Sequence, residues 1–116
     1  MKSLLIIPAM SNGNKIQNCM KSISESDYDG RSVVISPVNI DSVSDYGLGF
    51  LSTNGSIYPA DRYLYEATMS IDSPLDLIIY AHSDTILPKN WYSSLVATWD
   101  SVDPSRVGCI CLPYFK

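Results

Sequence analysis

The sequence has no long hydrophobic segment. No apolar run approaches the roughly 20 residues that a membrane-spanning helix needs, and the opening run Leu4-Leu5-Ile6-Ile7 is broken by Pro8. This run also lacks the longer apolar centre and the small-residue cleavage site of a secretion signal. We therefore expect a cytoplasmic protein without a membrane span.

Cysteine and histidine are scarce, with three cysteines and one histidine in the chain. An odd count without regular spacing is not a disulfide framework. Cys109 and Cys111 lie two residues apart in an apolar run and have no nearby Cys or His partner for zinc. We predict that both are buried thiols, because cysteine behaves as a small hydrophobic residue. With His82 as the only histidine, no Cys-His or Ser-His-Asp catalytic set can be recognised from the spacing.

Basic residues are too few for a nucleic-acid-binding protein. Lys and Arg number 8 against 12 Asp and Glu, which gives a formal net charge of −4. A general nucleic-acid binder would present a basic face, so we expect no nucleic-acid partner. A hydrophobic share of 46% in 116 residues is that of an ordinary folded chain with one core. We therefore expect a single domain over 1–116.

Apolar runs alternate with helical patterns along the chain. Continuous apolar runs, typical of strands covered on both faces, predict strands at 3–9, 31–36, 75–81 and 107–112. Apolar residues at helical spacing predict helices that begin near Asn14, Pro59 and Pro88. A short strand is also expected at 49–52, within a long segment of weak pattern. This order predicts an α/β domain with a mostly parallel sheet and helices on both faces.

Polar residues follow the third apolar run directly, as His82-Ser83-Asp84. Parallel sheets bind ligands at the carboxyl ends of their strands. Side chains alternate along a strand, so we expect His82 and Asp84 to point the same way. The pair could then hold a divalent metal, and the carboxylate favours Mg²⁺ or Mn²⁺. Alternatively, Asp84 caps the following turn and His82 is a half-buried polar residue.

The residues around this triplet carry a family resemblance. Segment 76–91, Asp-Leu-Ile-Ile-Tyr-Ala-His-Ser-Asp-Thr-Ile-Leu-Pro-Lys-Asn-Trp, resembles the metal-site segment of family 2 glycosyltransferases. In that family an apolar strand ends in Asp-x-Asp or a variant, followed by a short apolar-Pro link and a Trp-bearing helix. Segment 5–12, Leu-Ile-Ile-Pro-Ala-Met-Ser-Asn, is similar to the opening strand and Pro-x-x-Asn-like loop. Segment 58–67 sits at the Ala-Arg-Asn-like helix start, and 103–108 is similar to the stretch before the next strand.

The resemblance implies a GT-A fold that binds a nucleotide-diphospho-sugar donor with Mn²⁺ or Mg²⁺ and transfers the sugar to an unknown acceptor. Carried over to this chain, Asp84 matches the metal-binding Asp, and His82 replaces the first Asp of the motif. The residues that the resemblance places at the nucleotide-sugar are Pro8, Ala9, Ser11, Arg62, His82, Ser83 and Asp84. An alternative for Arg62 is a solvated position on a helix face.

The chain also departs from the family. Ser36 and Pro37 stand where the second strand usually ends in an Asp that contacts the nucleotide, with Asn39 and Asp41 further on. A complete GT-A domain is longer, and its later half usually carries the acceptor site and the catalytic base. The chain therefore resembles a truncated, N-terminal half of a GT-A domain, and no residue matches the base.

Two further expectations follow from the missing half. The second hypothesis, after the transferase, is a non-catalytic nucleotide-binding or interaction module of α/β fold. A flavodoxin-like signalling domain ranks last, because 7–9 offers no acidic cluster at the end of the first strand. A strand at 107–112 without its family neighbours would leave an unpaired edge, so we expect a homo-oligomer.

Overall fold

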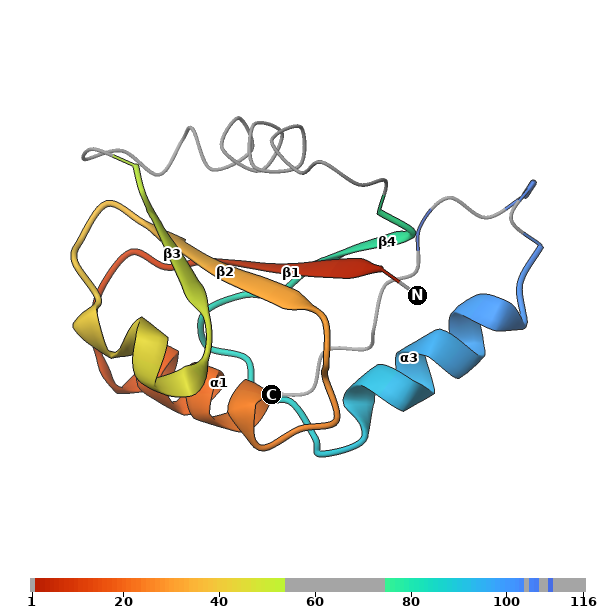
Figure 1. The fold of residues 1–116 in the computed structure, drawn as a ribbon, viewed down its shortest axis with the longest axis horizontal. Coiled ribbons are helices and arrows are strands. Elements are labelled where there is room, and N and C mark those ends of the chain that lie inside the picture. Colours follow the sequence, from red (N-terminus) through yellow and green to blue (C-terminus); the bar gives the residue numbers. More distant parts are fainter. Residues whose placement is uncertain (1, 54–74, 104, 107–108, 110–116) are drawn as a thin grey trace.

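The computed structural model describes residues 2–53, 75–103, 105–106 and 109. Within this part of the chain, a four-stranded sheet has the order β3-β2-β1-β4, and every neighbouring pair is parallel (Figure 1). The strands are β1 Ser3–Pro8, β2 Arg31–Ser36, β3 Gly49–Ser52 and β4 Leu77–Tyr80. The predicted α/β class with a parallel sheet is therefore confirmed.

Helix α1 connects β1 to β2, the 3-10 helix η1 connects β2 to β3, and helix α3 follows β4. Helix α1, Asn14–Ser24, begins after Gly13, and its buried residues are the predicted ones, Ile16, Cys19, Met20 and Ile23. The 3-10 helix η1, Asp41–Tyr46, was not expected from the sequence and ends at Gly47, whose φ of 76° favours glycine. Helix α3 spans Trp91–Asp100.

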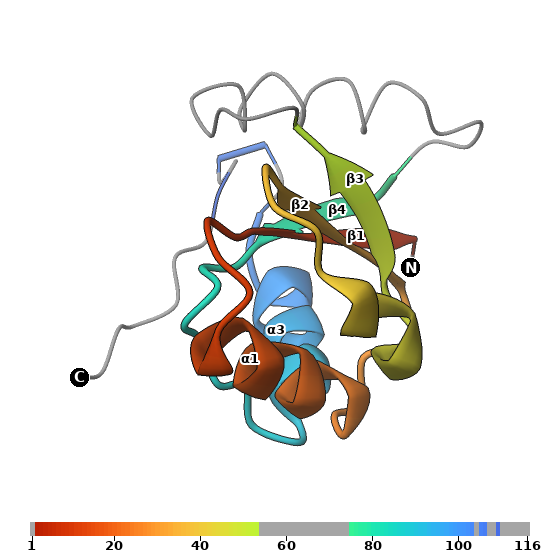
Figure 2. The same ribbon diagram turned by 90° about the vertical axis from the view of Figure 1, so that its left-hand side faces the viewer.

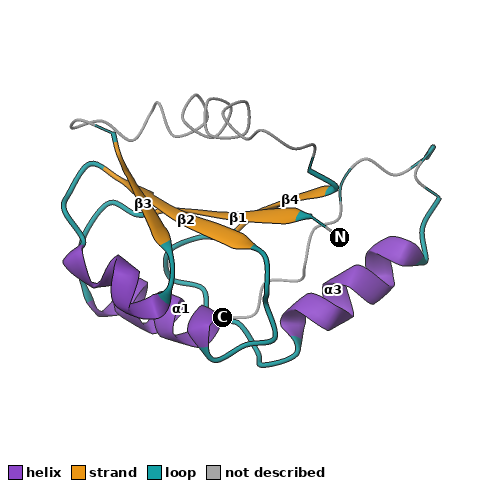
Figure 3. Cartoon of the chain, viewed as in Figure 1, coloured by secondary structure: helices purple, strands orange, loops and turns teal. Residues whose placement is uncertain are grey.

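Both described helices lie on one side of the sheet (Figure 3). Leu5, Ile7 and Val34 point to this side and share a core with α1 and α3. The alternate residues of β1, Leu4 and Ile6, point to the opposite face. The helix expected from 59 onward lies outside the described residues, as do Arg62 and the strand expected at 107–112.

Strand β4 is an edge strand within the described sheet. Its apolar run predicted a central strand, but β1 is the one neighbour that the described residues give it. Leu77 and Ile79 pack against the helix-side core, whereas Ile78 and Tyr80 on the other face are 47% and 48% exposed. An apolar run alone does not distinguish these two environments.

Helix α3 takes its N-terminal cap from a distant turn. Asn90, at the N-cap position, makes no side-chain capping bond. The Asp27 carboxylate, between α1 and β2, accepts hydrogen bonds from the backbone N–H groups of Tyr92 and Ser93, each at 3.0 Å. Leu95 of α3 is buried, whereas Trp99, one turn further on, is half-buried.

A chain of hydroxyl groups lies under the amino end of the sheet. The Tyr28 hydroxyl donates to the Arg31 carbonyl at 2.6 Å, and the buried Ser3 hydroxyl donates to Tyr28 at 3.2 Å. The Tyr92 hydroxyl lies 3.0 Å from Ser3 Oγ and must be the donor there, because the Ser3 proton is already used. The Tyr28 ring stacks on Trp91 and meets Tyr92 edge-on.

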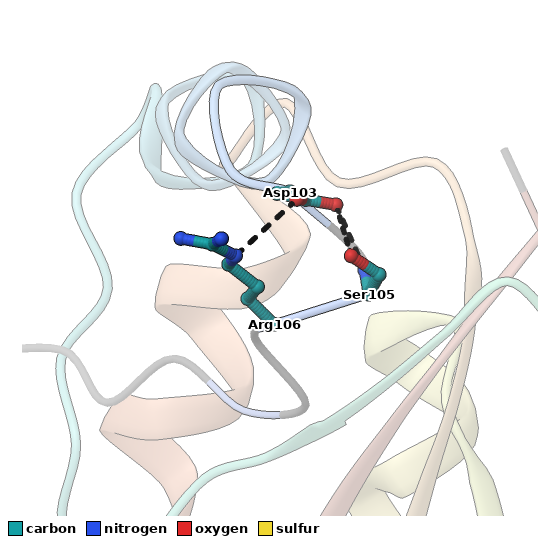
Figure 4. A network of polar contacts seen from close by, with 3 residues as sticks. All are labelled: Asp103, Ser105 and Arg106. Carbon is teal, nitrogen blue, oxygen red and sulfur yellow. Dashed lines mark hydrogen bonds and ion pairs between the residues drawn. The ribbon is translucent and has the colours of Figure 1, made fainter.

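The segment after α3 closes as a small polar turn around Asp103 (Figure 4). The Asp103 carboxylate accepts from the backbone N–H and the hydroxyl of Ser105, at 3.0 and 2.8 Å, and lies 3.9 Å from Arg106 Nε. Beyond it Cys109 is exposed, so the prediction of a buried thiol is wrong for this residue. Cys109 has no regular strand structure here, and it therefore lacks a sheet face to bury it. Cys111 lies outside the described residues.

Candidate functional site

The loops that follow the strands leave the sheet at one edge, the left-hand side of Figure 1 that faces the viewer in Figure 2. Backbone pairing extends one residue past the strands at this edge. Ala9 N–H donates to Ile35 at 2.9 Å, and Ala81 N–H donates to Ile6 at 3.0 Å. The expectation that the predicted site residues share the carboxyl edge of a parallel sheet therefore holds for those that the structure describes.

The loop after β1 combines a buried base with an exposed tip. Pro8 and Ala9 are buried, whereas Met10 is 56% exposed and Ser11 is exposed. Pro8 and Ala9 therefore shape the backbone at this edge, and the Ser11 hydroxyl is open to a ligand. The resemblance places these residues in a loop beneath the nucleotide, and this role stays a prediction.

A polar cluster that the sequence did not predict joins this loop to η1. Gln17 Nε2 of α1 donates to Asn12 Oδ1 at 2.8 Å and to Ser42 Oγ at 2.7 Å. The Ser42 hydroxyl also lies 2.9 Å from Gln17 Oε1, to which it donates. We refer to Asn12, Gln17 and Ser42 as the Gln17 cluster. No local pattern signals it, because Gln17 and Ser42 are 25 residues apart.

The loop after β2 is polar but carries no acid at the strand end. Ser36 is fully buried, and its hydroxyl accepts from Val38 N–H at 3.2 Å, which turns the chain out of the sheet. Asn39 Nδ2 donates to Asp41 Oδ1 at 2.5 Å, so an amide and a carboxylate stand together just beyond it. At the end of β3, the buried Thr53 Oγ1 has no hydrogen-bond partner among the described residues.

The His82-Ser83-Asp84 triplet forms a turn and does not continue the strand. Strand β4 ends at Tyr80, and Thr85 N–H donates to the His82 carbonyl at 3.1 Å. The argument from alternation therefore does not apply to His82 and Asp84, because alternation holds only in extended backbone.

The side chains at the two ends of the triplet, His82 and Asp84, are exposed to solvent. His82 is exposed and meets the Tyr80 ring edge-on at a centroid distance of 5.6 Å, so the alternative of a half-buried histidine is also wrong. Asp84 is exposed, and its carboxylate accepts no hydrogen bond from the described residues. The Asp84 carboxylate therefore does not cap the turn and is available to a ligand.

Cys19 of α1 packs directly beneath this turn. Its thiol lies 3.9 Å from the His82 carbonyl, to which it can donate. Burial, together with the nearby negative charge of Asp84, raises the pKa of Cys19 to about 11. Cys19 therefore stays protonated at neutral pH, when it is neither a nucleophile nor a metal ligand.

The side chains at the carboxyl end of the sheet could contribute ligands to a cation that is also bound by a substrate phosphate. Among the described residues, no three His, Cys, Asp or Glu side chains come together to hold a metal ion. The exposed Asp84 carboxylate is a hard oxygen ligand of the kind that Mg²⁺ and Mn²⁺ take, and Mg²⁺ usually keeps waters and substrate phosphates as its other ligands. The Asp84 carboxylate is therefore a possible ligand of such an ion, and the exposed His82 imidazole of the same turn is a second one.

The sequence matches no family model and no curated protein. The structure matches solved structures of Staphylococcus aureus TarS, a family 2 glycosyltransferase of GT-A fold. One TarS structure superposes with a TM-score of 0.66 at 17% identity, over 86% of this chain and 20% of that one. Two structures of TarS 1–349, one in complex with UDP and one with UDP-GlcNAc, give TM-scores of 0.62 and 0.61 at 18% identity.

These matches confirm the predicted GT-A fold. Each of the last two also covers 86% of this chain, which spans 32% and 31% of those structures. The chain therefore corresponds to about a third or less of the solved proteins that it resembles. Within the described residues, neither helix has the length and apolar character to cross a membrane.

Proposed function

We propose that this chain is the donor-binding part of a glycosyltransferase, which binds a nucleotide-diphospho-sugar with Mn²⁺ or Mg²⁺. The observation that carries the proposal is the β3-β2-β1-β4 parallel sheet, with exposed polar groups after β1 and β4, in a fold shared with TarS. TarS has been solved with UDP and with UDP-GlcNAc, so a uridine diphosphate donor is the first candidate here.

Each loop has a distinct role in this proposal. The loop of Pro8, Ala9 and Ser11 lies beneath the nucleotide, and its buried part keeps the backbone fixed while Ser11 stays exposed. The turn of His82, Ser83 and Asp84 faces the diphosphate. Arg62 remains a proposed contact to the base or phosphate on the basis of the sequence alone.

The Asp84 carboxylate would hold the divalent cation, and the His82 imidazole, from the same turn, is the second candidate ligand. When bound, such an ion offsets the negative charge of the diphosphate. With at most two candidate side chains, the affinity of the protein for the ion alone would be weak, and phosphate oxygens and water would complete the shell. The acceptor and the catalytic base would lie in a part of the GT-A domain that has no counterpart here.

Calorimetric titration of UDP, with and without Mn²⁺, tests the donor site in the wild type, Asp84→Ala and Asp29→Ala. Asp29 is an exposed acid in the turn before β2, at the amino end of the sheet, and is the matched control for net charge. We expect Mn²⁺ to strengthen UDP binding in the wild type and in Asp29→Ala, and to have no effect in Asp84→Ala. Equal binding in all combinations would exclude the metal role of Asp84, and no binding to the wild type would exclude the donor site.

A non-catalytic nucleotide-binding module would give the same titration. The two functions differ in whether UDP is released from UDP-GlcNAc over time. A coupled assay for free UDP, with Mn²⁺ and a panel of sugar acceptors, distinguishes them. Release above the buffer rate supports the transferase, and binding without release supports the module.

A further inference from the structure

The structure contains a device that fixes the shape of the proposed donor edge. We infer that Gln17 is a positioning residue, which holds the loop after β1 and the 3-10 helix η1 in one fixed arrangement. The functional part of this inference rests on the donor site proposed above, whereas its structural part does not.

The geometry of the amide supports this role. Gln17 is half-buried near the start of α1, between the two segments. Its Nε2 has two protons, and these match the two acceptors in reach, Asn12 Oδ1 at 2.8 Å and Ser42 Oγ at 2.7 Å. The Ser42 hydroxyl closes the arrangement by donating to Gln17 Oε1 at 2.9 Å. One side chain therefore satisfies groups from two loops that follow different strands.

Little else holds the loop after β1. Within the described part of the chain, the bond from Gln17 to Asn12 is the one side-chain hydrogen bond that residues 10–12 make. Backbone pairing to β2 ends with Ala9, and Gly13 already accepts as the cap of α1. Met10 and Ser11 are exposed, so they have no packing to fix them. Without Gln17, the tip of this loop is held only by the ends of β1 and α1.

The second partner of Gln17 is Ser42, which belongs to η1, at the carboxyl end of the sheet. Ser42 is the second residue of η1, and its neighbour Asp41 accepts from Asn39, just beyond the end of β2. The Gln17 cluster therefore connects the loop beneath the proposed nucleotide with the polar pair after β2. A ligand that touches both segments meets a preorganised surface, and preorganisation lowers the entropic cost of binding.

The test uses Gln17→Ala, Gln17→Glu and the control Asn18→Ala in the full chain. Asn18 is exposed on the same helix, next to Gln17. The Glu variant keeps two acceptor oxygens: Ser42 can still donate to one, and the Asn12 amide can rotate to donate to the other. We therefore expect Gln17→Glu to retain the arrangement and Gln17→Ala to lose it.

Two measurements separate the structural and functional parts. Amide exchange of η1, read at Val43, Gly47 and Leu48, whose N–H groups are hydrogen-bonded, should become faster in Gln17→Ala and stay unchanged in Gln17→Glu and Asn18→Ala. Titration of UDP with Mn²⁺ should show a loss of affinity of about threefold to tenfold in Gln17→Ala alone, the size expected for a hydrogen-bonded contact.

Unchanged exchange of η1 in Gln17→Ala would overturn the inference. Faster exchange with unchanged UDP affinity would overturn the positioning role at the donor site. If the wild type binds no UDP, the proposed function fails, and the exchange measurement still decides whether Gln17 couples the two segments.

Discussion

Replacing Gly30 with Ala should destabilise the protein by about 1–3 kcal/mol, through the hydroxyl chain at the amino end of the sheet. A Cβ at this position would lie 2.7 Å from Tyr28 Cζ and would overlap Ser3 Oγ and the Tyr28 hydroxyl oxygen. Tyr28 cannot swing away easily, because its ring lies 5.2 Å from Trp91 and 4.8 Å from Tyr92, between centroids.

Two routes of relaxation give the same magnitude. If the side chains stay in place, the overlap is an overpacking defect, which costs about 1–3 kcal/mol. If the Tyr28 ring shifts, its bonds to Ser3 and to the Arg31 carbonyl are lost. At a net of about 0.5–1.5 kcal/mol each, these two bonds also amount to about 1–3 kcal/mol. Either route therefore predicts a clear loss of stability.

Urea denaturation monitored by circular dichroism measures this loss. Gly49→Ala is the matched control, because a Cβ there would lie 3.5 Å from the Ser32 carbonyl oxygen, an ordinary contact. We expect this control to be neutral or slightly stabilising, since alanine has less chain entropy to lose than glycine. In a Tyr28→Leu background the added cost of Gly30→Ala should shrink. A change within about 0.5 kcal/mol for Gly30→Ala in the wild-type background would refute the reasoning, because that is the range of ordinary surface substitutions.

Two further outcomes concern titratable groups. Hydrogen bonds from the side chain and backbone of Ser93, together with one from Tyr92 N–H, lower the pKa of Asp27. The ionised form of Asp27 therefore stabilises the fold above the unfolded-state pKa of about 4. This stability is lost as the pH falls through the lower folded-state pKa. Melting temperatures measured across acid pH should consequently fall less steeply in Asp27→Asn than in the wild type, and parallel profiles would contradict the capping role. For Cys19, whose burial and proximity to Asp84 raise its pKa to about 11, alkylation by iodoacetamide near about pH 8 should be far slower than that of the exposed Cys109, because the thiolate is the reactive form. Asp84→Asn should accelerate the reaction of Cys19, and mass spectrometry that shows equal rates would place Asp84 away from the thiol.

The sequence predicted those elements whose apolar residues face one core. The buried positions of α1 recur at helical spacing, and the bounds of β2 and β3 coincide with the predicted 31–36 and 49–52. The 3-10 helix η1 buries only Val43, so it leaves no periodic signal. The run at 75–81 exceeded β4, because apolar character does not show where backbone pairing stops.

The location of the proposed site follows from the sequence, and its geometry does not. The rule that ligands bind at the carboxyl ends of parallel strands directs attention to segments 8–12, 36–39 and 81–84 from the order of elements alone, and the resemblance singles out Ser11 and Asp84 within them. The turn at His82 depends on a hydrogen bond from Thr85, which the residue types do not reveal. Gln17 joins two segments that are brought together only by the folded sheet, and a single sequence holds no signal for such a pair.

The distant cap of α3 has a consequence for how the protein folds. Asp27 and Tyr92 are 65 residues apart, so their contact closes a long loop, at an entropic cost that local contacts do not have. A helix of 10 residues is only marginally stable by itself in water, and Asn90 adds no side-chain cap to nucleate it. Helix α3 therefore acquires its order from the assembled β1, α1 and β2 segment, and it should join the folding nucleus late, after that segment has formed.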